Sequence, residues 1–389
     1  MQINKIISLN CCFVKHNLVS KFSCSNMSEK HLQPKFSQSQ VVELMKRLYR
    51  LTPLEIYSLP SYEDQNFHVA ASEGGEYILK IMNSKDSKNP ALIDVQTSAM
   101  SFLHDKGYPT QTALPTIFGQ LMSLEELDYG YGCQKYLVRL LTYLTGTMVC
   151  KVSVTSQLLY ETGKMAAQMD TILQKLEHPY LSMLQRDNFI WHLSRIPMLE
   201  AYINFFDGDP LQEVVKSVIH QFNTSVIPKL SYFRKCLNHS DLNQMNILVQ
   251  PNESDGHRIS GILDFCDMNS GCFIYELAIT IMNMMLEHQN PIEVGGHVLA
   301  GWESVLPLNK PEKDCLYVLV LSRLCQSVVL VNYEIIQNPE NKEYFMFTRK
   351  NDAQILSQLW ELGSKHVEKI WFQTAAGWTE EDKHQGKVI

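Results

Sequence analysis

The fold of this 389-residue chain is decided by the stretch Asn238-His-Ser-Asp-Leu-Asn-Gln-Met-Asn-Ile-Leu-Val249. Within it, His239, Asp241 and Asn246 form an H-x-D-x-x-x-x-N pattern, and Asp264 follows in a G-I-L-D-F sequence. Phosphoryl transfer to a hydroxyl requires a carboxylate that orients and deprotonates the hydroxyl, and oxygen ligands that hold magnesium on the triphosphate. The order of these residues therefore predicts Asp241 as the catalytic base, with Asn246 and Asp264 as the metal ligands.

The spacing of the motif brings its two halves together. Four residues separate Asp241 from Asn246, which allows a turn between the base and the metal ligand. Apolar strands are expected over residues 246–249 and 259–263, and the polar segment 250–258 between them contains the Pro and Gly of a hairpin loop. Asp and Asn also commonly form turns, but the complete ordered set favours the catalytic interpretation.

A small sheet upstream is expected to supply a lysine for the phosphates. Strands are predicted over residues 54–59, 66–71 and 77–82. Lys80 lies on the third strand and is predicted to bind the nucleotide, although a solvated strand lysine is the alternative. The turn between the first two strands, residues 59–66, contains no glycine, so the G-x-G-x-x-G signature of protein kinases is absent.

Two helices are predicted around this sheet. The first begins after Ser37 or Ser39, ends near Arg50, and has an apolar face made by Val41, Leu44, Met45 and Leu48. The second begins at Asn89-Pro90 and ends at about Asp105. Asp94 is the only carboxylate in the body of the second helix, and we predict that it pairs with Lys80; an ordinary surface acid is the alternative.

The run from Tyr136 to Gly146 reads as a buried strand that continues into a connector. In a two-lobed kinase the purine base contacts such a connector, which predicts Leu141 and Tyr143 as nucleotide-binding residues. Helical periodicity dominates the chain after Thr155. The predicted organisation is an extension, an N-lobe, a helical C-lobe and a loose tail, over residues 1–34, 35–144, 145–378 and 379–389.

Composition limits the function classes. Hydrophobic content of 45% and charged content of 19% are typical of a soluble globular protein. No stretch is expected to span a bilayer, because the apolar run from Leu316 to Val331 contains Arg323. The net charge of −7 argues against general nucleic-acid binding and favours a cationic small substrate. The ten cysteines lack C-x-x-C spacing, which predicts neither a zinc site nor a disulfide framework. No obligate protein partner is evident.

The first 26 residues contain three lysines and no Asp or Glu. This pattern resembles a mitochondrial transit peptide, but such peptides are normally rich in arginine and this segment has none. Met27 is an alternative start of the protein. We therefore expect an inert extension and a cytoplasmic protein, with mitochondrial targeting as the alternative.

Together these features resemble the aminoglycoside phosphotransferase and choline kinase group. Several longer segments are similar to hydroxylysine kinases in particular, at residues 59–69, 136–144, 188–191, 276–282 and 295–301. The resemblance implies an α+β, protein-kinase-like fold with a small antiparallel-sheet N-lobe and a mainly helical C-lobe. It also implies Mg²⁺-dependent transfer of phosphate from GTP to 5-hydroxy-L-lysine, in lysine and collagen breakdown in the cytoplasm. Two positions depart from the family: Ser240 replaces Gly in H-G-D, and Cys266 replaces Gly in D-F-G.

Substrate-binding residues are expected from charge complementarity, because hydroxylysine carries two ammonium groups and one carboxylate. Asp267 and Glu276 are predicted ammonium partners, Arg323 is the predicted carboxylate partner, and Trp191 is predicted to line the pocket. The alternatives are a loop cap or metal contact for Asp267, a buried Glu276–Arg323 pair, and an ordinary core position for Trp191. His239 is expected to brace the catalytic loop and not to transfer a proton.

Two other functions stay open at this point. One is a kinase for another amino alcohol, such as choline or ethanolamine. The other is a catalytically silent nucleotide-binding module, which Ser240 and Cys266 suggest. The presence of Lys80, Asp241 and both predicted metal ligands favours an active enzyme.

Overall fold

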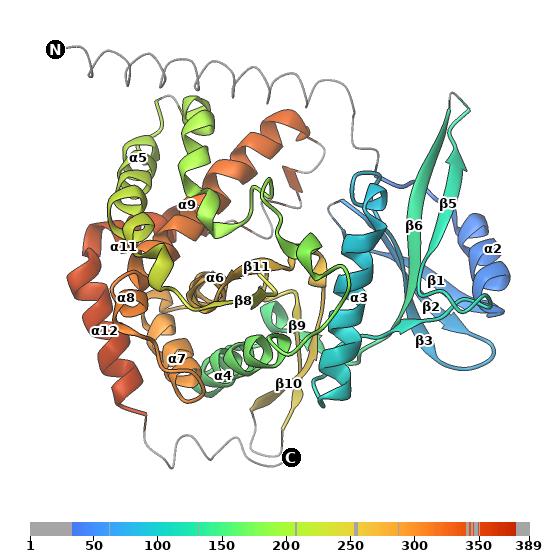
Figure 1. Cartoon of the computed structure of the whole chain (residues 1–389), viewed down its shortest axis with the longest axis horizontal. Coiled ribbons are helices and arrows are strands. Elements are labelled where there is room, and N and C mark those ends of the chain that lie inside the picture. Colours follow the sequence, from blue (N-terminus) through green and yellow to red (C-terminus); the bar gives the residue numbers. More distant parts are fainter. Residues whose placement is uncertain are drawn as a thin grey trace.

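A computed structural model describes residues 33–378 of the chain, apart from 62, 131, 207, 253–255, 287, 340, 341, 344, 346–348 and 350. The predicted tail and residues 1–32 of the predicted extension, including the possible targeting segment, lie outside the described residues. The described part has the predicted α+β fold, with one lobe built on an antiparallel sheet and a mainly helical second lobe (Figure 1).

The smaller lobe contains a six-stranded antiparallel sheet in the order β1-β2-β3-β6-β4, with β5 paired to β6. Its elements are α2 (Gln38–Tyr49), β1 (Pro53–Leu59), β2 (Gln65–Ala71), β3 (Glu76–Ile81), α3 (Pro90–Asp105), β4 (Ala113–Leu114), β5 (Ser123–Asp128) and β6 (Cys133–Thr142). One face of the sheet packs its apolar side chains against α2. The opposite face carries Lys80 and is covered by α3, which lies between the sheet and the helical lobe (Figure 1).

Local sequence signals explain both helices of this lobe. Ser37 caps α2 and forms a capping box with Gln40, and Arg50 ends the helix in the left-handed conformation. The four predicted apolar residues of α2 are its buried ones. Asn89 caps α3 by accepting a hydrogen bond from the Leu92 N–H, and the helix has the predicted bounds.

The larger lobe is mainly helical and carries two small sheets, β10-β9-β7 and β11-β8. Its strands are β7 (Thr147–Met148), β8 (Lys235–Asn238), β9 (Ile247–Pro251), β10 (His257–Ile262) and β11 (Asn269–Cys272). Its helices are α4 (Ser156–Leu173), α5 (Leu211–Gln221), α6 (Phe273–Met285), α7 (Pro291–Glu303), α8 (Lys310–Lys313), α9 (Leu316–Gln337), α11 (Asp352–Leu362) and α12 (Ser364–Ala376). The predicted hairpin between the halves of the motif is confirmed as the antiparallel pair β9–β10.

Several contacts join the lobes, among them the chain connection after β6 and a backbone hydrogen bond at the end of β10. Residues 143–146 link β6 of the first sheet to β7, which pairs with β9 in the second lobe. A second contact joins the segment after α3 to the end of β10, where the Ile262 N–H donates to the Pro109 carbonyl at 2.8 Å.

Helix α9 is longer and more apolar than the sequence analysis allowed. With 22 residues it meets the length and composition of a membrane span, but 89% of its most apolar window is buried inside the lobe. Its apolar character is therefore accounted for by its position as the central core helix, where it packs against α6, α11 and the segment η4 (Leu193–Phe206).

Helices α4 and α7 approach each other closely because glycines lie at their contact. A Cβ atom at Gly163 of α4 would overlap the carbonyl oxygen of Val298. A Cβ atom at Gly301 of α7 would likewise overlap the carbonyl oxygen of Tyr160. Backbone is in contact with backbone at both points, so neither clash can be relieved by a side-chain rotation.

We expect the substitution Gly163→Ala to lower the free energy of unfolding by about 1–3 kcal/mol, because the added methyl group forces the helices apart. The matched control is Gly377→Ala at the end of α12, where a Cβ atom meets only ordinary contacts of 3.4 and 3.5 Å. The control should change stability by less than about 0.5 kcal/mol. Urea denaturation followed by circular dichroism measures both, and equal effects would contradict the close approach.

Candidate active site

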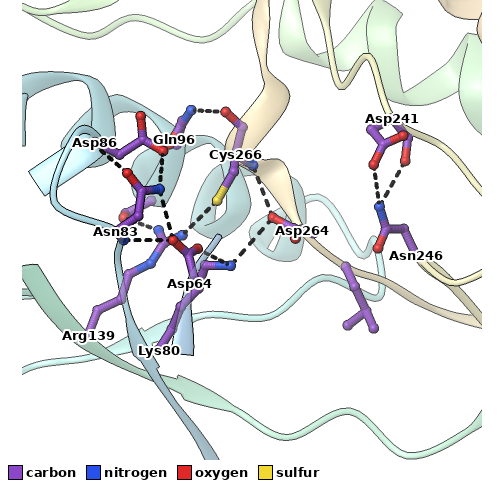
Figure 2. Close-up of polar contacts among 12 residues, drawn as sticks. Asp64, Lys80, Asn83, Asp86, Gln96, Arg139, Asp241, Asn246, Asp264 and Cys266 are labelled. Atoms are coloured by element: carbon purple, nitrogen blue, oxygen red, sulfur yellow. Dashed lines mark hydrogen bonds and ion pairs between the residues drawn. The ribbon is translucent and has the colours of Figure 1, made fainter. Parts of the chain in front are cut away.

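The catalytic loop lies between β8 and β9, and its side chains hold Asp241 in one orientation. Asn246 donates from Nδ2 to both the backbone oxygen and Oδ2 of Asp241, at 3.0 Å each. Asn243 donates to the same Oδ2 at 2.8 Å. Figure 2 shows Asp241 and Asn246 facing each other beside Asp264. The structure thus brings together the predicted base and both predicted metal ligands.

His239 braces this loop as expected. Its buried ring donates from Nε2 to the Leu263 carbonyl at 2.9 Å and accepts at Nδ1 from the Asp241 N–H at 3.3 Å. Burial lowers the pKa of His239, which favours the neutral ring that this donor and acceptor arrangement requires. The imidazole therefore ties the base to the residue that precedes Asp264.

Ser240 occupies a backbone conformation that favours glycine, with φ 70°. A left-handed conformation costs an L-residue about 1–2 kcal/mol. Asn269 donates a hydrogen bond from Nδ2 to the Ser240 hydroxyl at 2.7 Å, which offsets about 0.5–1.5 kcal/mol of that cost. Ser240 is therefore in a strained backbone conformation, and the hydrogen bond that its hydroxyl accepts from Asn269 compensates part of that strain.

Glu276 of α6 is fully buried and accepts the Ser240 N–H at both carboxylate oxygens, at 3.2 and 3.0 Å. Burial raises the pKa of this carboxyl to about 7, even though the hydrogen bonds from the loop favour its charged form. Because Glu276 has no exposed surface, its predicted role as a substrate ammonium partner is wrong. Glu276 instead holds the catalytic loop in place through its hydrogen bonds with the Ser240 N–H.

Arg323 of α9 is only 2% exposed and is also occupied by the protein. Its Nη1 donates to the Trp191 carbonyl and to Gln326 Oε1 at 2.8 Å each, and its Nη2 donates to the Ser240 carbonyl at 3.4 Å. The predicted contact with a substrate carboxylate is therefore wrong. The alternative buried Glu276–Arg323 pair is not a direct ion pair among the described residues, but the two charges interact, because Arg323 opposes the rise in the pKa of Glu276 and Glu276 opposes the burial-driven fall in the pKa of Arg323.

Trp191 is half-buried, and its ring lies 5.1 Å from the Arg323 guanidinium. The cation that contacts the Trp191 ring in this structure is therefore the Arg323 guanidinium and not a substrate ammonium group. A contact between Trp191 and the substrate stays a prediction.

Lys80 is almost fully buried between two carboxylates, as Figure 2 shows. Its Nζ lies 2.9 Å from Asp64 Oδ2 and 3.7 Å from Asp264 Oδ1. Burial disfavours the charged amine, but Asp264 and Asp64 outweigh that effect and raise the pKa of Lys80 well above its usual value. Asp64 is itself fixed by the N–H and Nδ2 groups of Asn83, at 2.8 and 3.0 Å.

The predicted Lys80–Asp94 pair is therefore wrong. Asp94 lies on a different face of α3, where its carboxylate is 3.5 Å from His178 Nε2. The face of α3 towards the sheet instead presents Gln96 and Thr97, which contact the Cys266 carbonyl at 2.7 Å and the Arg139 guanidinium at 2.8 Å. The sequence analysis missed Asp64, whose only signal was an acid in a glycine-free turn next to the lysine strand.

Asp264 is held in a left-handed conformation at φ 56° and accepts the Cys266 N–H at 3.3 Å. Partial desolvation raises the pKa of this carboxyl, whose side chain is 43% exposed, but Lys80 and the bond from Cys266 outweigh that effect and lower the pKa to about 2. Among the described non-glycine residues, positive φ occurs only at Arg50, Ser240 and Asp264, so Cys266 fits its position without strain.

The predicted metal ligands have the oxygens that Mg²⁺ requires. The amide nitrogen of Asn246 is engaged by Asp241, while Asn246 Oδ1 and Asp264 Oδ2 accept no hydrogen bond from the described residues. The described residues contain no cluster of three His, Cys, Asp or Glu that forms a complete metal site. Mg²⁺ commonly takes one or two protein ligands and completes its shell with phosphates and water, so this pair fits it.

The predicted purine-binding residues lie beside the lysine strand. Leu141 is opposite Ile78 in the β3–β6 register, on the face that carries Lys80. The Tyr143 N–H donates to the Glu76 carbonyl at 3.3 Å, and its ring packs edge-on against His68. Their contact with a nucleotide stays a prediction.

Asp267 is half-buried, and its carbonyl shares the Asn269 amide with the hydroxyl of Ser240, the residue before the predicted base Asp241. Burial and the charge of Asp241 raise the pKa of the Asp267 carboxyl to about 8, against the opposing effect of Arg186. This position suits the predicted ammonium partner, and Arg186 is a neighbour that the sequence analysis did not single out.

The sequence and the fold of this chain are similar to those of known phosphotransferases and kinases. The chain matches the phosphotransferase enzyme family over residues 57–312. It is 56% identical over 349 residues to a Danio rerio protein named hydroxylysine kinase, covering 90% of this chain and 98% of that protein. A Mus musculus protein of the same name is 44% identical, covering 91% and 97%. An amicoumacin kinase solved with AMP-PNP and Ca²⁺ has a similar fold, with TM-score 0.62 and 17% identity over 86% of this chain and 94% of that one.

We expect Ser240→Gly to be more stable than Ser240→Ala by about 0.5–1 kcal/mol, because the left-handed penalty exceeds the extra flexibility of glycine in the unfolded chain. Both variants lose the hydrogen bond from Asn269, so the comparison isolates the backbone. Thermal unfolding measures the difference. An alanine variant as stable as the glycine variant would contradict the strained conformation.

We expect Asp64→Asn to lower the free energy of unfolding by about 1–3 kcal/mol, because it removes the nearer carboxylate from the buried Lys80 ammonium. The matched control is Asp94→Asn on α3, which should change stability by less than about 0.5 kcal/mol. A larger loss of stability in Asp94→Asn than in Asp64→Asn would instead support the predicted pairing of Lys80 with Asp94.

Proposed function

This chain belongs to the phosphotransferase enzyme family, and we propose that it transfers the γ-phosphoryl group of GTP to the hydroxyl of 5-hydroxy-L-lysine. The product is 5-phosphohydroxy-L-lysine. Identities of 44–56% with proteins named hydroxylysine kinase, over about nine-tenths of the chain, support this acceptor. GTP is the donor that the resemblance to hydroxylysine kinases implies. We propose that the reaction serves lysine and collagen breakdown in the cytoplasm.

The observation that carries the proposal is the fixed position of the Asp241 carboxylate beside Asp264 and Lys80. The acceptor hydroxyl oxygen bonds to the γ-phosphorus, the bond from that phosphorus to the β–γ bridging oxygen breaks, and GDP leaves. Asp241 orients the hydroxyl and accepts its proton, while Lys80 neutralises the phosphates that are not transferred. When bound, Mg²⁺ supplies charge neutralisation on the phosphates, and Asn246 and Asp264 are the residues that would hold it.

We expect purified protein to phosphorylate 5-hydroxy-L-lysine in the presence of Mg²⁺, with GTP preferred over ATP. Choline and ethanolamine serve as competing acceptors, and phosphorus NMR detects the product. The substitution Asp241→Asn should lower kcat by about 10²–10⁴-fold, because proton acceptance is lost. The matched control Asp105→Asn, at the exposed end of α3, should retain full activity.

Each outcome of this assay has a distinct meaning. Turnover of choline or ethanolamine without turnover of hydroxylysine would show that the acceptor is one of those amino alcohols and not hydroxylysine. Absence of any turnover would favour a silent nucleotide-binding module. Equal rates for the wild type and Asp241→Asn would reject the assigned base, and equal use of ATP would reject GTP selectivity.

A further inference from the structure

Asp267 and Arg186 lie next to the catalytic loop, and neither forms an ion pair within 4.0 Å in the part of the chain that the structure describes. Asp267 ends the short helix η7 (Phe265–Asp267), and its half-buried carboxylate has no hydrogen bond or ion pair with any described residue. Asn269 donates from Nδ2 to both the Asp267 carbonyl and the Ser240 hydroxyl, at 2.9 and 2.7 Å, which places Asp267 next to the residue that precedes Asp241. An unpaired, half-buried carboxylate is a favourable position for a ligand cation.

Arg186 is held rigidly beside this carboxylate by a separate segment of the chain. It lies between η3 (Leu181–Leu184) and η4, and its Nη1 donates to the carbonyls of Cys266 and Met268, at 2.8 and 3.4 Å. Its guanidinium stacks 3.8 Å above the Phe189 ring. The side chain is half-buried, and its Nε and Nη2 groups make no hydrogen bond within the part of the chain that the structure describes.

Arg186 opposes the rise in the pKa of the Asp267 carboxyl, so the two side chains are neighbours, but they are not joined by a close ion pair. Arg186 bonds to the backbone on both sides of Asp267, yet no ion pair within 4.0 Å joins the two side chains. The other charged candidates, Glu276 and Arg323, are enclosed and bonded to the protein. Among the residues predicted or found near the base, Asp267 and Arg186 are therefore the charged pair that is open to a zwitterionic molecule.

We propose that Arg186 binds the α-carboxylate of the acceptor and that Asp267 binds the ammonium group next to the reacting hydroxyl. This inference rests on the proposed function. In 5-hydroxy-L-lysine one ammonium group is on the carbon adjacent to the hydroxyl carbon, so a hydroxyl oriented by Asp241 carries that ammonium towards Asp267. The carboxylate is at the other end of the chain, where a planar guanidinium provides paired donors.

The assignment gives the enzyme a means to reject simpler amino alcohols. Choline and ethanolamine have a cationic group near the hydroxyl but no carboxylate. They would leave the Arg186 donors unpaired in a partly buried site, which weakens binding of the wrong acceptor. Specificity then comes from the irregular segment around Arg186 and not from the catalytic loop.

Two acceptor analogues separate the two contacts. The first is 1,5-diaminopentan-2-ol, which keeps the hydroxyl and both amines but lacks the carboxylate. The second is 2-amino-5-hydroxyhexanoic acid, which keeps the carboxylate but lacks the ammonium next to the hydroxyl. Steady-state kcat/KM is measured for hydroxylysine and both analogues at saturating GTP.

We expect Arg186→Gln to lower kcat/KM for hydroxylysine by about 10- to 100-fold, mainly through KM, because a charge-assisted bond to the carboxylate is lost. Turnover of 1,5-diaminopentan-2-ol should be unchanged. Asp267→Asn should show the reverse selectivity, with a loss for hydroxylysine and none for 2-amino-5-hydroxyhexanoic acid. Arg186→Lys keeps the positive charge and should retain more activity with hydroxylysine than Arg186→Gln. This comparison separates the loss of the charge from misfolding of the glutamine variant.

The matched control is Arg195→Gln, an arginine of the neighbouring segment that pairs with Asp187 at 3.7 Å, which should leave all three acceptors unaffected. If Arg186→Gln lowers turnover of hydroxylysine and of 1,5-diaminopentan-2-ol equally, Arg186 only supports the Cys266 turn and the inference is overturned. A rise in KM for GTP with every acceptor would instead assign Arg186 to the phosphates and also overturn it. Failure of the wild type to phosphorylate hydroxylysine would overturn the proposed function and this inference together.

Discussion

A buried ammonium group needs compensating negative charge, and the arrangement of this molecule depends on how Lys80 obtains it. One carboxylate comes from the turn before β2 and the other from the end of β10, so the two lobes are joined through a single cation. The neighbouring Arg139 guanidinium is also buried, but its bonds go to the Thr97 hydroxyl and the Cys266 sulfur and to no described carboxylate. Lys80 and Arg139 carry two positive charges against the two negative charges of Asp64 and Asp264, and among these described residues Arg139 is the one without a carboxylate partner.

The apolar helices α6 and α9 each contain one buried charge, and both charges act on one residue. Glu276 accepts the N–H of Ser240, and Arg323 donates to its carbonyl, so a negative and a positive group hold opposite ends of the same residue. Each charge is buried because it satisfies backbone groups that would otherwise lack partners. The catalytic loop is thus positioned by the core of the helical lobe and not by surface contacts.

Much of the fold, and the approach of Asp241 and Asn246 to the segment before Asp264, could be predicted, because their signals are local. The capping residues Ser37 and Asn89 and the hairpin after Asn246 are short-range features that the tertiary structure preserved. The errors concerned partners. Helical periodicity does not tell which face of α3 meets the sheet, so Asp94 was assigned to Lys80. Arg186 was missed because an irregular segment has no periodicity from which its direction can be deduced.

The hydrogen bond between Ser240 and Asn269 makes two positions dependent on each other. A change to glycine at position 240 relieves the backbone but leaves the Asn269 amide with one fewer acceptor, while a change at position 269 leaves the strained serine without compensation. The effect of a residue at position 240 on stability therefore depends on which residue is at position 269, and the reverse is also true. The effects of substitutions at positions 240 and 269 on stability should not be additive.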